Sequence, residues 1–204
     1  MKRVLILFAH PALHKSDINQ LLFNASAEHP GVTLVDLYAR YPTFDIDIEA
    51  EQQQLRQHDV IVFMFPLYWY STPALLKEWQ DLVLEHDFAY GSHGTALRGK
   101  HFFCVTSAGG SEKGYQHQGY NHFTIRELLQ PLEQTANLTH MTYVPPLVLF
   151  SARTAMDDGR AQQHRANWVN LLEHILSEQI NLDDTVDYPT LNDFWTGRLQ
   201  EANP

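Results

Sequence analysis

The sequence predicts a doubly wound α/β fold, with five parallel strands in the order 2-1-3-4-5 and helices on both faces of the sheet. Apolar runs without polar alternation recur along the chain, as expected of strands that are buried on both faces of a parallel sheet. Segments with the apolar spacing of helices separate these runs. The chain has 204 residues, which is enough for one domain with a sizeable core, and it contains no internal repeat.

Five segments are predicted as strands. They cover residues 4–9, 32–37, 60–65, 100–106 and 140–150, and the predicted helices cover 17–25, 48–57, 73–83, 123–136 and 155–179. Pro66 should end the third strand, because proline cannot donate a hydrogen bond to a neighbouring strand. Pro145 and Pro146 lie inside the last segment, so we expect an edge strand or an early end there.

Composition narrows the function classes. Fourteen Lys and Arg against 24 Asp and Glu give a formal charge of −10, and no basic stripe is present, which argues against nucleic acid as a partner. The single cysteine, Cys104, lies in an apolar run and is expected to be a buried thiol. Neither a signal peptide nor an apolar run of about 18 residues is present, so we expect a cytoplasmic protein.

The last part of the chain does not fit the alternating pattern. We divide the chain into a domain at 1–179 and a C-terminal extension at 180–204. The extension carries Tyr188, Leu191, Phe194 and Trp195 and is too aromatic for a disordered tail. We expect it to dock on its own domain or on a second subunit.

The predicted strand order places a switch point between the first and third strands, where ligands bind in open α/β sheets. Three loops should meet there, at residues 10–19, 67–71 and 106–120. The first loop has neither GxGxxG nor GxxxxGK[ST], which disfavours a Rossmann or P-loop nucleotide site.

The first loop still offers an anion site. Ser16, Asn19 and the backbone N–H groups at the start of the predicted helix suit one phosphate. His10 is either a second donor to that phosphate or a loop residue bonded to the backbone, and the sequence leaves both readings open. Asp17 is unfavourable beside an anion, although it could cap the helix.

The other two loops suit a flat ring. Tyr68, Trp69 and Tyr70 are consecutive aromatics between a strand and a helix, and they either hold a flat aromatic cofactor or pack locally. The small residues at 106–110 either let a ligand approach the backbone or form an ordinary flexible loop. Taken together, the three loops suit flavin mononucleotide (FMN) better than a sugar or a peptide.

Five segments of the sequence resemble those of a known protein family. VLILFAHP, DLYARYPTFDIDIEAEQ, VIVFMFPLYWYSTPALLKEW, FAYGSHGTALRGK and VTSAGG resemble the flavodoxin-like NAD(P)H:quinone oxidoreductases, and among them the ancillary subunits of glutathione-regulated potassium-efflux systems. The resemblance spans roughly residues 4–110, is looser over YVPPLVL, and does not extend to the C-terminal extension.

The resemblance implies a flavodoxin-like fold that binds FMN, with FAD as the alternative. It implies hydride transfer from NAD(P)H through the flavin to a quinone or similar small acceptor, in a homodimer whose site lies at the subunit interface. The alternative function is a regulatory subunit that activates a glutathione-gated potassium antiporter, which would place the protein at the inner face of the cell membrane.

The same resemblance assigns residues to the site. The residues expected to hold the flavin are His10, Ser16, Asp17, Ile18, Asn19, Pro66, Leu67, Tyr68, Trp69, Tyr70, Thr106, Ser107, Ala108, Gly109 and Gly110. Tyr115 and His122 are the expected catalytic pair, although the histidine position of the family falls on Asn121 and His122 is alternatively a helix-start or surface histidine. No metal site is predicted. A hydrolase is disfavoured because GxSxG is absent, and a phospho-receiver because no acidic pair follows the first strand.

Overall fold

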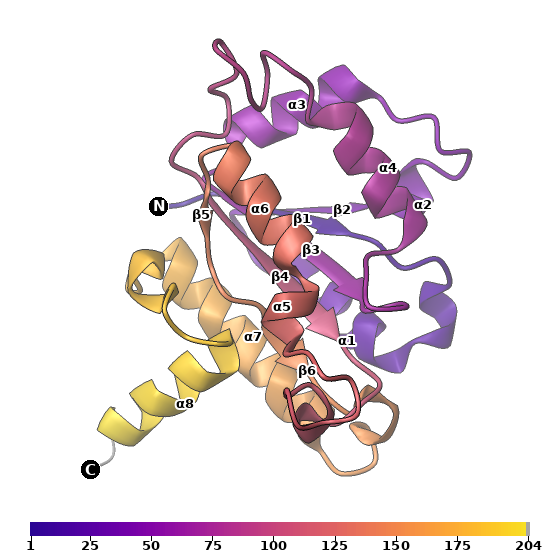
Figure 1. The fold of residues 1–204 in the computed structure, drawn as a ribbon, viewed down its shortest axis with the longest axis vertical. Coiled ribbons are helices and arrows are strands. Elements are labelled where there is room, and N and C mark those ends of the chain that lie inside the picture. Colours follow the sequence, from indigo (N-terminus) through magenta and orange to yellow (C-terminus); the bar gives the residue numbers. More distant parts are fainter. Residues whose placement is uncertain (203–204) are drawn as a thin grey trace.

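The computed structural model describes the backbone of residues 1–202 and the side chains of residues 1–196. One parallel sheet forms its centre (Figure 1). Its strands are β1 (Val4–Phe8), β2 (Val32–Asp36), β3 (Val60–Pro66), β4 (His101–Ser107), β5 (Thr142–Tyr143) and β6 (Leu147–Leu149). The order is β2-β1-β3-β4-β5, and β6 also pairs with β4. The predicted fold class and strand order are confirmed.

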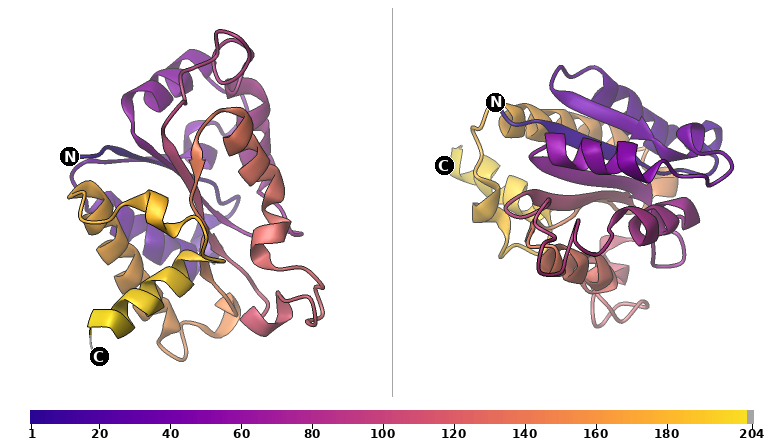
Figure 2. Two further views of the ribbon diagram at one scale, coloured as in Figure 1. Left: turned by 60° about the vertical axis from the view of Figure 1, so that its left-hand side comes forward. Right: turned by 90° about the horizontal axis from the view of Figure 1, so that it is seen from above.

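Helices cover both faces of the sheet (Figures 1 and 2). They are α1 (Asp17–Ala27), α2 (Leu37–Arg40), α3 (Ile48–Gln57), α4 (Ala74–Val83), α5 (Ile125–Leu128), α6 (Gln130–Leu138), α7 (Arg160–Leu176) and α8 (Leu191–Ala202). Alternate residues of β1 serve the two faces: Leu5 and Leu7 pack with α3, α4 and α6, whereas Ile6 and Phe8 pack with α1 and α7. The central strands β1 and β3 and nearly all of β4 are therefore buried on both sides, which explains their continuous apolar sequences.

A buried carboxylate joins α3 to α4, the helices before β3 and after the second loop. Glu51 on α3 is fully buried and accepts hydrogen bonds from Tyr41 Oη at 2.7 Å and from Trp79 Nε1 on α4 at 2.9 Å. Arg40 lies 3.3 Å from the same carboxylate, so the buried charge is paired. Cys104 is buried as expected, and burial raises the pKa of its thiol.

Several predicted boundaries needed correction. The single strand at 140–150 is divided into β5 and β6, because Pro145 and Pro146 supply no N–H to the ladder. The predicted helix at 123–136 is two helices, α5 and α6, with a proline in the first turn of α6. The predicted helix at 155–179 shortens to α7, which begins after Gly159.

The described part of the C-terminal extension packs on its own domain. Ile180, Leu182 and Leu191 are buried in the core on the α7 side of the sheet. Asn192 Oδ1 accepts from Val148 N–H at 2.8 Å, and Asn192 Nδ2 donates to Val148 O at 2.9 Å. One side-chain amide thus takes the place of a neighbouring strand beside β6. The last two residues of the predicted extension, 203–204, lie outside the described residues.

Within residues 1–202, no helix combines the length and the apolar character that crossing a bilayer requires.

Candidate functional site

The three loops predicted to meet do so at the carboxyl ends of β1, β3 and β4. Leu67 N–H donates to Ser107 O at 2.9 Å, which ties the second loop to the third. Asn19 Nδ2 lies 3.3 Å from Ser107 Oγ, which ties the first loop to the third. His10 Nε2 lies 3.4 Å from Tyr68 Oη and links the first loop to the second. Direct hydrogen bonds therefore hold the three loops as one unit.

The first loop forms the start of an eleven-residue helix, α1. Ser16 is its N-cap, and Ser16 Oγ accepts from Asn19 N at 3.3 Å and from Asn19 Nδ2 at 2.8 Å. Asn19 and Ile18 are buried, whereas Asp17 is exposed in the first turn, where its charge favours the positive end of the helix. The remaining N–H groups of this turn can bind an anion.

His10 is a neutral hydrogen-bond donor. It is 5% exposed, and its Nδ1 accepts from Ala12 N–H at 3.0 Å, which leaves the proton on Nε2. Burial lowers the pKa of His10, and the nearby charge of Asp36 opposes this effect without reversing it. The two readings of His10 are therefore compatible, because one nitrogen bonds the backbone and the other has its N–H directed at the second loop.

The second loop is a strained two-residue turn. Tyr68 and Ser71 exchange both backbone hydrogen bonds, at 3.0 and 3.1 Å, around Trp69 and Tyr70. Trp69 has φ 47° and Tyr70 has φ 64°, a pair of left-handed conformations that usually requires Asn or Gly. Trp69 is also 93% exposed. Strain without compensating burial is typical of a ligand-binding segment.

The third loop brings small residues to the same place. Thr106 and Ala108 are buried, and Thr106 Oγ1 donates to Phe65 O at 2.8 Å, which joins this loop to the end of β3. A Cβ added to Gly110 would lie 2.0 Å from Tyr120 Oη, so glycine lets that ring approach. A Cβ added to Gly109 would meet only Arg153 Nε, at 3.9 Å, so the backbone of Gly109 faces open space.

A cavity of about 340 Å³ lies between the second and third loops. Its lining residues are Leu67, Trp69, Tyr70, Gly109, Gly110, Tyr115, Tyr120, Asn121 and Arg153. The volume is typical of a small-molecule site, for which roughly 300–1,000 Å³ is usual. Aromatic side chains with a few polar groups suit a flat, polar ring. His10, Ser16 and Asn19 do not line this cavity; they flank it through Tyr68 and Ser107.

The expected catalytic pair is separated. Tyr115 lines the cavity and is 7% exposed. Burial raises the pKa of its phenol, and Tyr120 and Tyr70 add smaller effects in the same direction. The phenol therefore keeps its proton and can donate a hydrogen bond. His122 is exposed and is not among the lining residues. The structure brings its neighbour Asn121 to the cavity instead.

Asn121 and Arg153 line the cavity but were not among the residues expected to hold the flavin or to act in catalysis. Asn121 Oδ1 accepts from Tyr70 Oη at 3.1 Å, while its buried Nδ2 has no hydrogen-bond partner among the described residues. Position 121 is where the resembling family has a histidine, so an amide replaces an imidazole ring in this chain. Arg153 gave no signal, because it lies far along the chain, just after β6.

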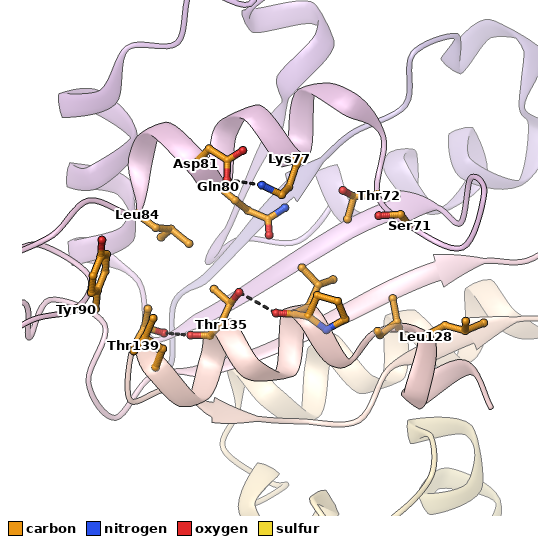
Figure 3. A pocket seen from close by; sticks show the side chains of 14 residues that line it. Ser71, Thr72, Lys77, Gln80, Asp81, Leu84, Tyr90, Leu128, Thr135 and Thr139 are labelled. Atoms are coloured by element: carbon orange, nitrogen blue, oxygen red, sulfur yellow. Dashed lines mark hydrogen bonds and ion pairs between the residues drawn. The ribbon is translucent and has the colours of Figure 1, made fainter. Parts of the chain in front are cut away.

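A second cavity, of about 230 Å³, lies between α4 and α6 (Figure 3). Lys77 and Gln80 from α4, with Leu84 just after it, face Thr135 from α6 and Thr139 just after that helix. Its wall is mainly apolar, and among the described residues no cluster of three potential metal ligands exists here or elsewhere. This groove begins at Ser71 and Thr72, the residues that follow the strained turn.

A family model for the flavodoxin-like fold matches residues 2–172 of the chain. Among curated relatives, the glutathione-regulated potassium-efflux system ancillary protein KefG of Cronobacter sakazakii is 48% identical over 151 residues, covering 74% of this chain and 82% of that protein. The chain thus belongs to the family of proteins with the flavodoxin-like fold.

Solved structures agree in fold. The general stress protein 14 of Treponema denticola, in complex with FMN, is 33% identical, with a TM-score of 0.79 over 84% of this chain and 98% of that one. An NADPH-quinone reductase from P. pentosaceus is 37% identical, with a TM-score of 0.75 over 83% and 96%. A thermophilic tryptophan halogenase from Streptomycin violaceusniger is 45% identical, with a TM-score of 0.76 over 83% and 96%. The names of these proteins span more than one activity.

Proposed function

We propose that the protein is an FMN-dependent oxidoreductase that transfers electrons from NAD(P)H to a quinone or a similar small acceptor. The observation that carries the proposal is the cavity of about 340 Å³ beside the first turn of α1, both held by the same set of hydrogen bonds. The FMN complex of the Treponema protein and the NADPH-quinone reductase support it.

The residues present fit FMN. The buried Nδ2 of Asn121 is a donor without a partner among the described residues, the Nε2–H of His10 has only a 3.4 Å contact with Tyr68 Oη, and Gly109 leaves its backbone open toward the cavity. The aromatic lining would hold the ring. Ser16, Asn19 and the first turn of α1 would hold the phosphate.

FMN, when bound, supplies the redox chemistry, because it accepts two electrons as a hydride and passes them on. The chain itself binds, orients and excludes water. Tyr115 and Asn121 would donate hydrogen bonds to oxygen atoms that gain negative charge, and the protonated state of Tyr115 suits this role. His122 was expected in this role, and we now assign it to Asn121.

The first experiment is to purify the protein, release any bound flavin and identify it by chromatography. We expect one FMN per chain and reduction of a soluble benzoquinone by NADH or NADPH. Release of FAD would correct the cofactor, and a colourless protein that does not take up added FMN or FAD would refute the proposal.

The phenol of Tyr115 is tested by Tyr115→Phe, with the exposed Tyr188→Phe as the matched control. We expect quinone reduction to slow about tenfold or more, as for the loss of one hydrogen bond to a charged group, with little change in FMN affinity. Unchanged quinone kinetics would exclude the role proposed for Tyr115.

We also propose that a second copy of the chain covers the exposed aromatic side chains beside the cavity. Trp69, Tyr120 and Phe123 are 93, 66 and 54% exposed, and the apolar groove between α4 and α6 begins just beyond this turn. Light scattering should then give the mass of a dimer. Leu138→Glu, at an exposed leucine of the groove, should shift the dimer toward monomer; a wild-type monomer would contradict the proposal.

A second candidate function is regulation of a potassium-efflux antiporter from the cytoplasmic side of the membrane. The similarity to KefG favours it. Co-purification with such an antiporter, and faster glutathione-gated potassium efflux when both are present, would support it. Efflux that is the same with and without this protein would reject it. Reductase activity and antiporter activation can coexist in one protein.

A further inference from the structure

The cavity contains a cation that the proposed chemistry has not yet used. Arg153 is the one charged residue among the described residues that line it. It stands in a protein with a formal charge of −10, next to the open backbone of Gly109. A lone cation in an aromatic cavity favours whichever state of a bound ring carries negative charge.

The segment that carries Arg153 is bonded to the third loop. Ser151 N–H donates to Gly110 O at 2.8 Å, and Ala152 N–H donates to Ala108 O at 3.0 Å. These two bonds run on either side of Gly109. The backbone of Arg153 is therefore fixed relative to the wall of the cavity.

A second arginine, Arg160, forms hydrogen bonds with the residues on both sides of Arg153 in the chain. Arg160 Nη1 donates to Phe150 O at 2.7 Å, and Arg160 Nη2 donates to Thr154 Oγ1 at 3.0 Å. Asp158 pairs with Arg160 at 2.8 Å. Arg160 therefore uses its guanidinium to pair with Asp158 and to bond backbone carbonyl groups. Among the described side chains, no carboxylate forms an ion pair with Arg153.

We propose that Arg153 balances the negative charge that the flavin ring acquires on reduction, and so raises the midpoint potential of the bound FMN. Reduction by two electrons and one proton leaves one negative charge on the ring, spread over its pyrimidine part. The inference rests on the proposed function, since it concerns the same cavity and cofactor.

The test compares Arg153→Gln, Arg153→Lys and a matched control, Arg98→Gln, each loaded with FMN. Arg98 is also exposed but lies at the opposite end of the sheet, beside Gly99 and His101. The measurements are the affinity for oxidised FMN, by fluorescence quenching, and the midpoint potential, by equilibration with reference dyes. Urea unfolding checks that each variant is folded.

We expect Arg153→Gln to reduce the preference for reduced over oxidised FMN about tenfold, which lowers the midpoint potential by about 30 mV for a two-electron couple. Solvent screening at this exposed side chain keeps the effect moderate. Arg153→Lys should keep most of the wild-type potential, and Arg98→Gln all of it.

Three results would overturn the inference. The first is that Arg153→Gln binds FMN and the bound FMN has the same midpoint potential as in the wild type. Arg153→Gln could instead weaken NADPH and not NADH at an unchanged potential, which would assign Arg153 to the 2′-phosphate of the nucleotide. A wild-type protein that binds no flavin would refute the proposed function itself, and the affinity measurement distinguishes that case from the first two.

Discussion

The two ends of the sheet differ in how they bond their buried histidines. Burial lowers the pKa of four histidines, two at each end. At the amino end, His58 bonds Gln54 O at 2.6 Å and Thr33 Oγ1 at 2.7 Å, so both its nitrogens are used. His101 there bonds Asp183 at 3.0 Å.

At the carboxyl end, His10 Nε2 has only the 3.4 Å contact with Tyr68 Oη. His164 Nε2, beside the end of β6, has no partner among the described residues.

Ion pairs and left-handed residues occur at both ends of the sheet, but only those at the carboxyl end lie beside the three loops. At the amino end, ion pairs join Met1 to Glu178 and Arg3 to Asp59. At the carboxyl end, Trp69 and Tyr70 adopt left-handed conformations without the help of glycine. At the amino end the named histidines and charges are therefore paired within the chain, whereas the carboxyl end combines the strained turn with the Nε2 of His164, unpartnered in the described part of the chain, as a binding site does.

The largest expected effect concerns His164. Burial lowers the pKa of His164 to about 4 from its ordinary 6.5, so the unfolded chain binds more protons than the folded one between these values. The free energy of unfolding should fall by about 3 kcal/mol as pH drops from 6.5 to 4 through this group. Urea unfolding across this range measures it.

The matched variants for this prediction are His164→Leu and the exposed His93→Leu. His164→Leu should weaken the pH dependence without abolishing it, since His10, His58 and His101 contribute in the same direction. His93→Leu should leave it intact. Equal pH dependence in wild type and His164→Leu would show that His164 charges in the folded protein without penalty.

Next in size is the affinity for FMN after Asn19→Leu. This change removes the bonds of Asn19 Nδ2 to Ser16 and Ser107, which join the first loop to the third. At about 1 kcal/mol for each lost hydrogen bond, the affinity for FMN should fall by up to about 30-fold. Asp59→Asn at the amino end should leave FMN affinity unchanged. If both variants bind FMN like the wild type, the two ends do not differ in function.

The strained turn should show opposite effects on stability and binding. Replacing Trp69 by Asn and Tyr70 by Gly gives the residues that this turn prefers, and the free energy of unfolding should rise by about 2 kcal/mol. FMN affinity should fall, because the aromatic wall is lost. Asp87→Gly relieves another left-handed residue, with φ 63°, before β4 and should stabilise the fold without affecting FMN. A double variant that retains FMN affinity would mean that the turn does not touch the ring.

The smallest effect is expected for Arg3→Gln. Arg3 and Asp59 lie 3.8 Å apart with side chains 58 and 46% exposed, so the pair contributes between about 0 and 1 kcal/mol. Unfolding in urea at low and high salt should show a small loss that disappears as salt screens the pair. If the loss of stability persists in high salt, it comes from the packing of the Arg3 side chain and not from its charge.

Much of the fold was predictable because burial on both faces leaves a continuous apolar strand. The end of β3 at Pro66 and the bounds of α3 follow the predictions closely. The left-handed turn at Trp69 and Tyr70 was not predictable, since local rules place Asn or Gly there. Arg153 was missed for another reason, because only the folded chain brings the end of β6 beside Gly109.

The amide of Asn192 has a consequence for the solubility of shorter forms of the protein. It occupies the outer side of β6 with a donor and an acceptor, as a seventh strand would. A chain cut after residue 179 would expose Val148 and its neighbours as an open template for strands of other copies, which is a common route to aggregation. The extension therefore keeps copies of the sheet from adding to one another.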